Sequence, residues 1–168
     1  MQQGNSSIMT STSSYYRQQY ELVQDSRAVL LAYCKTISQA DFIEQNSSFG
    51  RGGSIKNLLV HIVNTYLFWV GNTTLKNTLE FIGYEANLNL SRIVPLFEEV
   101  DKVMHMFIEL LEKSELDQIS YELNGVRSTA DPFKVFSHLI THEFHHKGQI
   151  LSMSRHLGYI PVDTDIMR

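Results

Sequence analysis

The stretch that decides the fold is DPFKVFSHLITHEFHHKGQILSMSRHLG, residues 131–158. Asp131 is a favourable N-cap residue, and Pro132 at the first helical position costs no hydrogen bond. Gly158 supplies a left-handed stop, and Pro161 prevents the helix from continuing. Between these signals apolar residues recur every three or four positions, which predicts one long amphipathic helix. Its predicted core stripe consists of Val135, Leu139, His142, His146, Gln149, Ile150, Met153 and Leu157.

Three further segments carry helical periodicity. They are expected over about residues 13–37, 55–72 and 91–113. Ser54 and Ser91 are the expected N-caps of the second and third segments, and Pro95 would fall in the first turn of the third. The stripe of the first segment has one charged interruption, Arg27. Four amphipathic helices with irregular connections predict an all-α protein, most economically a four-helix bundle.

The connections between these helices carry weaker signals. Residues 47–53 are small and break the periodicity, and residues 73–90 are ambiguous, compatible with a short helix plus a loop. Residues 115–130 contain Asn124-Gly125, a pair typical of hairpin turns, and predict a connection with a weak hairpin. No segment alternates convincingly enough to predict any other strand.

Length and charge limit the possible functions. The chain has 168 residues, enough for one ordinary domain, which we expect over residues 15–168 after a disordered segment 1–14. A net charge of -4, from 14 basic and 18 acidic residues, argues against nucleic-acid binding. Without a signal peptide or a run of 18 apolar residues, no membrane association is expected, and the expected compartment is the cytoplasm.

Histidine is the unusual residue type. His142 and His146 are one helical turn apart and occupy core positions, where a polar ring needs a partner. A divalent cation bound to both rings is one solution, and hydrogen bonds to neighbouring helices are the other. His61 favours the cation, because it lies on the apolar face of the second segment. Three imidazoles leave a coordination position open, as in catalytic sites, and suit zinc and nickel equally.

These residues also carry a resemblance to a known family. The segment from His142 to Ile150, HEFHHKGQI, is similar to the signature of the DinB family, as is the stretch from Gly53 through His61 to Trp69. The resemblance extends over the chain from about residue 15. It implies a four-helix bundle of DinB-like topology, a homodimer, and a divalent metal held by three histidines. Carried over by position, the ligands would be His61, His142 and His146.

The remaining histidines have ordinary interpretations. His138 lies one turn before His142, and we expect it to be a neighbour of the ligands rather than a ligand. His145 points about 100° away from His146, which predicts packing or a subunit contact. His105 and His156 have no partner at ligand spacing.

Four other positions of the histidine segment also carry expectations. Gln149 is a candidate to orient a ligand or a bound water. Gly148 is expected to permit the close approach of another helix. Glu143 and Lys147 form an i,i+4 pair in the favoured order, and the preferred interpretation is a solvated ion pair. No carboxylate can be assigned as a general base.

The resemblance implies a function as well. The DinB-like superfamily includes metal-dependent transferases and isomerases that use low-molecular-weight thiols. We therefore expect a thiol-dependent S-transferase acting on a small molecule, with a metal-dependent hydrolase or a non-catalytic metal-binding stress protein as alternatives. The single cysteine, Cys34, lies on a core stripe and makes an external thiol the more consistent nucleophile. Some aromatic residues near the histidines are expected to line a pocket; the candidates are Tyr66, Phe68, Trp69, Phe133, Phe136 and Phe144.

Overall fold

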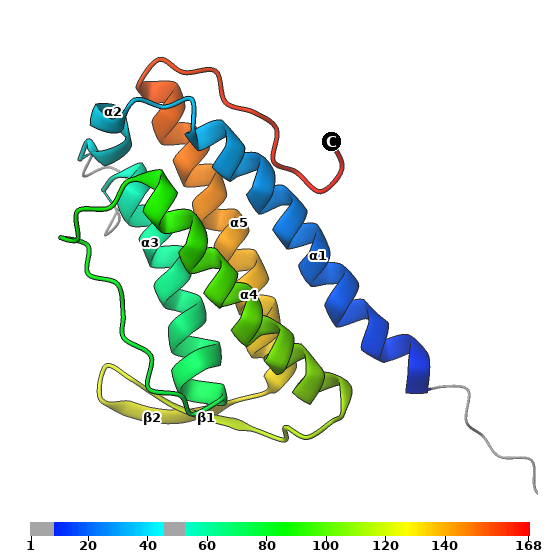
Figure 1. Ribbon diagram of the computed structural model, residues 1–168. Helices are drawn as coiled ribbons and strands as arrows, with labels where there is room; N and C mark the ends of the chain where they lie inside the picture. Colours follow the sequence, from blue (N-terminus) through cyan, green and yellow to red (C-terminus); the bar gives the residue numbers. More distant parts are fainter. Residues whose placement is uncertain (1–8, 46–52) are drawn as a thin grey trace, which may run out of the picture.

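The protein is predominantly helical in a computed structural model that describes residues 9–45 and 53–168 (Figure 1). The elements in chain order are α1 (Met9–Cys34), α2 (Gln39–Ile43), α3 (Ile55–Tyr66), the π-helix η2 (Leu67–Thr74), α4 (Leu90–Glu112), β1 (Ile119–Leu123), β2 (Val126–Ala130) and α5 (Pro132–His156). The prediction of a mainly helical protein is confirmed, with two short strands added to it. No helix among these residues has an apolar stretch of the length needed to cross a bilayer.

The long helices lie side by side, and the two strands form a hairpin across one end (Figure 1). α1 packs against α4 and α5, while α3 packs against α4 and α5. The segment after α5 returns along α1 (Figure 1), where Ser26 Oγ donates to the Thr164 carbonyl. Polar and apolar contacts therefore connect every long helix to at least two others.

The core between the helices is apolar and well buried. Each long helix contributes one stripe to it, as the periodicity predicted. Fully buried members include Val23, Leu30, Leu58, Leu59, Ile62, Val100, Met104, Phe107, Leu139 and Ile150. Cys34 is also buried, as predicted.

The boundaries of α1 differ from the prediction. The helix begins at Met9, so residues 9–14, expected in a disordered segment, are helical, while residues 1–8 lie outside the described part. It ends at Cys34 rather than at Ile37, because the next amides bond three residues back, Thr36 to Tyr33 for example. Such tight i to i+3 bonds close the last turn and end the helix.

The start of α4 also corrects the prediction. Asn89, not Ser91, is the N-cap, and its side-chain oxygen accepts from the Arg92 amide at 3.2 Å. Ser91 lies inside the helix and donates to Asn89 instead. Since Leu90 is the first helical residue, Pro95 stands in the second turn. Its missing N–H therefore removes one intrahelical bond, which the first turn would not have required.

The second predicted helix changes its winding halfway. Ser54 caps α3 as predicted, accepting from the Asn57 amide at 3.1 Å, but the α-helix gives way to η2 at Leu67. The Leu75 amide closes η2 by bonding to the Val70 carbonyl, five residues back. A β-carbon on Gly71 would lie 2.6 Å from the Leu79 side chain, so glycine lets the following loop pack on η2. No helix follows between residues 75 and 89, so the short helix considered there is absent.

The hairpin lies where the Asn-Gly pair predicted a turn. β1 and β2 pair antiparallel, and Asn124 and Gly125 connect them with φ values of 53° and 77°. Positive φ at both positions is the requirement of a type I′ turn. Most side chains of the two strands are exposed, so the strands lack the alternation that would have predicted them. At the far end of the hairpin, α5 starts and stops as predicted, with Asp131 accepting from the Phe133 amide and Gly158 at φ 92°.

Candidate metal centre

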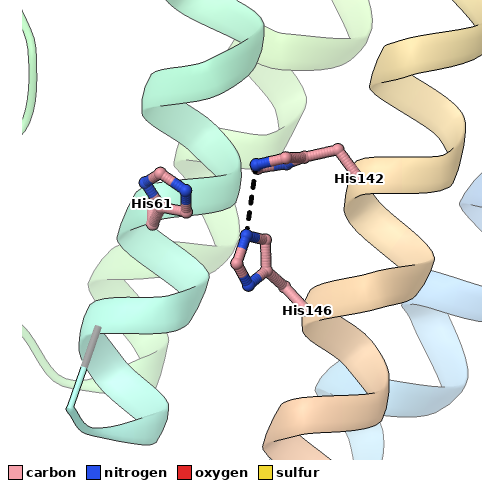
Figure 2. A group of neighbouring side chains, drawn as sticks. All are labelled: His61, His142 and His146. Atoms are coloured by element: carbon pink, nitrogen blue, oxygen red, sulfur yellow. Dashed lines mark hydrogen bonds between the residues drawn. The ribbon is translucent and has the colours of Figure 1, made fainter. Parts of the chain in front are cut away.

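Three histidines from two helices converge on one point (Figure 2). His61 comes from α3, and His142 and His146 come from successive turns of α5. Each offers one ring nitrogen, and these nitrogens all lie within 4.8 Å of one another. The His61 ring lies 5.0 Å from that of His142 and 4.7 Å from that of His146, centroid to centroid. The structure therefore brings together the three residues that the sequence singled out.

The separation of the donor atoms fits a divalent cation. The Nε2 atoms of His142 and His146 are 3.1 Å apart. Two nitrogens at about 2.05 Å from one cation lie about 2.9 Å apart in octahedral geometry and about 3.4 Å apart in tetrahedral geometry. The observed distance falls between these values, so both rings reach one ion without a change of rotamer. In the structure the same two nitrogens share one hydrogen bond.

Hydrogen bonds orient two of the rings. His146 Nδ1 lies 2.6 Å from Gln149 Oε1, and an amide oxygen only accepts, so Nδ1 carries the proton and Nε2 keeps its lone pair. Gln149 thus has the orienting position that we expected. His61 Nδ1 lies 3.1 Å from the Tyr84 hydroxyl. Tyr84 was not predicted, because the loop that carries it has no periodicity to place it.

Burial keeps the ligand rings neutral. Burial and then the neighbouring His146, His61, His138 and His145 lower the pKa of His142 to about 3. The pKa of His146 falls to about 4, again mainly through burial, with Gln149 opposing the shift. Neutral imidazole is the form that binds metal, so these two rings need no deprotonation at pH 7.

Removing the partner of His146 should weaken metal binding. Gln149→Leu frees the His146 ring to rotate and to change tautomer, and we expect zinc affinity to fall by about 10- to 100-fold. Competition with a chromophoric chelator measures this directly. Gln149→Glu, which keeps an acceptor for Nδ1–H, is the control and should retain most of the affinity. Equal affinities for Gln149→Leu and the wild type would contradict the orienting role.

The other histidines lie outside the cluster. The His138 ring is tilted against that of His142, with centroids 5.3 Å apart, and it also contacts Trp69, so His138 is a neighbour rather than a member of the group. His145 is exposed, although its ring lies 4.9 Å from that of His146. His105 packs edge-on against Tyr20, and His156 Nδ1 lies 2.8 Å from the Ser152 carbonyl.

The Glu143–Lys147 pair corrects the prediction of a solvated surface pair. Both side chains are buried, at 0% and 1% exposed, and their charged atoms are 3.1 Å apart. Glu143 also accepts two hydrogen bonds from Arg27, at 3.0 and 2.9 Å, and one from the Tyr66 hydroxyl at 2.7 Å. Arg27, expected as an interruption of the α1 stripe, is therefore the partner that allows Glu143 to be buried.

This buried network is complete and electrically balanced. Arg27 also donates to Asp101 of α4 at 2.6 Å, so two cations face two carboxylates. The Lys147 ammonium has three acceptors: Glu143, the Ser26 hydroxyl and the Val23 carbonyl. Burial raises the pKa of Glu143, but the Arg27 and Lys147 charges outweigh it and lower that pKa to about 2. With its four acceptor sites occupied, Glu143 is not placed to act as a general base.

The network connects all four long helices next to the cluster. Its members come from α1, α3, α4 and α5, and Glu143 lies between the two ligands of α5 in sequence. It therefore anchors the helix that carries His142 and His146. Gly148 is exposed, and a β-carbon there would meet no atom of residues 9–45 or 53–168 within 4 Å, so no helix in this part of the chain makes the close approach expected at Gly148.

Comparison with known proteins supports the resemblance. No curated protein matches the chain. The family model described as the DinB family matches residues 1–168, the whole length of the sequence. The histidine motif, the position of His61 and this match agree. The chain belongs to the DinB family.

Proposed function

We propose that the protein is a metal-dependent enzyme that transfers a low-molecular-weight thiol to an electrophilic small molecule. Its scaffold in this proposal is a four-helix bundle of DinB-like topology that forms a cytoplasmic homodimer. The observation that carries the proposal is the convergence of His61, His142 and His146, with ligand nitrogens within 4.8 Å of one another. Zinc and nickel both suit three imidazole ligands.

Two features favour a reactive site over a structural one. No fourth histidine, cysteine or carboxylate among the described residues joins the group, and structural zinc sites are closed by four protein ligands. His61 and His142 are also only half-buried, so a small molecule can reach the cluster. A bound divalent cation supplies Lewis acidity, which holds a coordinating thiol as its thiolate at neutral pH.

The chain's own residues favour an external thiol as the nucleophile. Burial raises the pKa of the Cys34 thiol to about 12, so it stays protonated and unreactive. In the proposed reaction the external sulfur forms a C–S bond with the electrophile, the leaving group departs with its electron pair, and the thiol proton goes to water. Hydrolysis is less favoured, because no carboxylate in the described part of the chain joins the group as a base for water attack.

A conjugation assay tests the proposal. Zinc- or nickel-loaded protein is incubated with a panel of cellular thiols and a chlorinated nitroarene, and thioether formation is followed by absorbance. We expect metal-dependent conjugation with at least one thiol, and a loss of at least about 100-fold in His146→Ala, which removes a ligand. His156→Ala, on the same helix but outside the group, is the control. Equal rates for the wild type and His146→Ala would overturn the proposal.

A further inference from the structure

A small cleft lies beside the histidine cluster, where η2, the hairpin and the first turns of α5 meet. Its volume is about 210 Å³. Trp69 of η2 and Tyr121 of β1 belong to its lining, with ring centroids 4.9 Å apart. Val135 and His138 of α5 also line it, together with the exposed Lys134. The sequence predicted a weak hairpin but not η2, and no local signal placed the two beside the start of α5, so the cleft was not predicted.

The cleft leads to the proposed reaction centre. His138 belongs to its lining, and the His138 ring lies 5.6 Å from that of Trp69 and 5.3 Å from that of His142. These contacts form a continuous path from Trp69 to the ligand His142. A molecule seated in the cleft therefore contacts His138, whose ring adjoins that of the ligand His142.

The walls and the volume suit one aromatic ring. Trp69 and Tyr121 present ring surfaces, and Val135 and Leu123 are aliphatic. A cavity of about 150 Å³ holds benzene, so 210 Å³ leaves room for a ring and small substituents. Drug-sized ligands occupy sites of about 300–1,000 Å³. The cleft therefore selects a compact ring over a larger ligand.

Lys134 adds a charge to this apolar cleft. Its side chain forms no hydrogen bond or ion pair with residues 9–45 or 53–168, in contrast to Lys147 and Lys102, which are both paired. An ammonium without a protein partner at the rim of an aromatic cleft is complementary to an anion carried by the ligand.

We propose that this cleft binds the electrophilic substrate and that the substrate is a small aromatic anion. Its ring lies between Trp69 and Val135, and its carboxylate or sulfonate pairs with Lys134. This inference names the substrate class of the proposed enzyme, so the role of the ligand as a substrate rests on the proposed function. The binding itself requires only the residues of the cleft, so it is testable without metal or turnover.

Trp69 makes the test direct, because it is the one tryptophan of the sequence. Metal-free protein in chelator is titrated with benzenesulfonate, and binding is followed by Trp69 fluorescence excited near 300 nm and by calorimetry. Benzenesulfonamide is the matched neutral probe. We expect saturable quenching by the sulfonate. The affinity for the sulfonamide should be lower by about 1.5- to 5-fold, since an exposed ion pair contributes about that factor to binding.

Variants at Lys134 test whether its ammonium pairs with the anionic group of the ligand. Lys134→Met should lower the affinity for benzenesulfonate by about 1.5- to 5-fold and leave that for benzenesulfonamide unchanged, while Lys134→Arg should retain both. Lys113→Met, at the end of α4, is the matched control and should behave as the wild type. Equal affinity of Lys134→Met and the wild type for the sulfonate, or no saturable binding of either probe, would overturn the inference. Saturable, Lys134-dependent binding combined with failure of the conjugation assay would support the cleft and contradict the transferase.

Discussion

His142→Ala is expected to lower the affinity for zinc or nickel by at least about 100-fold. Losing an orienting partner of a ligand costs about 10- to 100-fold, and His142 is itself one of three converging ligands, so its loss costs at least as much. Elemental analysis after dialysis should find about one metal ion per chain in the wild type and almost none in the variant. Competition with a chromophoric chelator gives the ratio of the two affinities.

The loss of metal affinity in His142→Ala should also lower the free energy of unfolding measured in the presence of metal. At a free metal concentration 1,000 times the Kd, binding stabilises the folded state by about 4.1 kcal/mol. A 100-fold weaker variant at that concentration gains only about 1.4 kcal/mol. Unfolding in urea, with and without metal, measures this difference. His156→Ala is the control, because it removes an imidazole of α5 that bonds to Ser152 instead of joining the cluster. A wild-type protein that binds no metal in chelator-free buffer would exclude the site.

Local signals were enough to predict the helix that carries two of the ligands. Asp131, Pro132 and Gly158 act within one turn of the helix ends, so their effects need no knowledge of distant residues. The same holds for Ser54 and for the turn at Asn124-Gly125. The three histidines were found because polar rings occupied positions that periodicity assigned to the core.

The burial of Glu143 and Lys147 could not be predicted from their spacing. An i,i+4 pair looks the same on a surface and in a core, and the residue that decides between them, Arg27, is 116 positions away from Glu143. The sequence did contain a weaker indication of the buried network, because Arg27 interrupts an apolar stripe and a buried arginine needs an acidic partner. Tyr84 and η2 were missed for a related reason, because their positions depend on packing rather than on local periodicity.

Arg27→Met is expected to lower the free energy of unfolding by about 3–5 kcal/mol, the range for breaking a buried ion pair on one side. The variant removes two of the four hydrogen bonds that Glu143 accepts and leaves that carboxylate buried at 0% exposed. This loss is a large share of the about 5–15 kcal/mol that stabilises a typical domain. Urea unfolding in chelator measures it without a contribution from metal. Arg127→Met is the matched control, and should cost about 0.5 kcal/mol or less, because the Arg127–Glu122 pair is exposed.

A triple variant separates the lost packing of the arginine from the weaker pairing of the buried charges, because Glu143 and Lys147 stay paired with each other in Arg27→Met. If the weakly compensated buried charge causes the destabilisation, Arg27→Met combined with Glu143→Gln and Lys147→Met should be more stable than Arg27→Met alone, since the variant then buries neither the carboxylate nor the ammonium. If lost packing against Phe97 and Tyr66 causes it, the two further changes should give no recovery. Arg27→Lys keeps the positive charge but loses the bidentate contact with Glu143, and it should fold even where Arg27→Met does not. Recovery in the triple variant and an intermediate stability for Arg27→Lys would establish that α5, with His142 and His146, is held in place by charge pairing with α1.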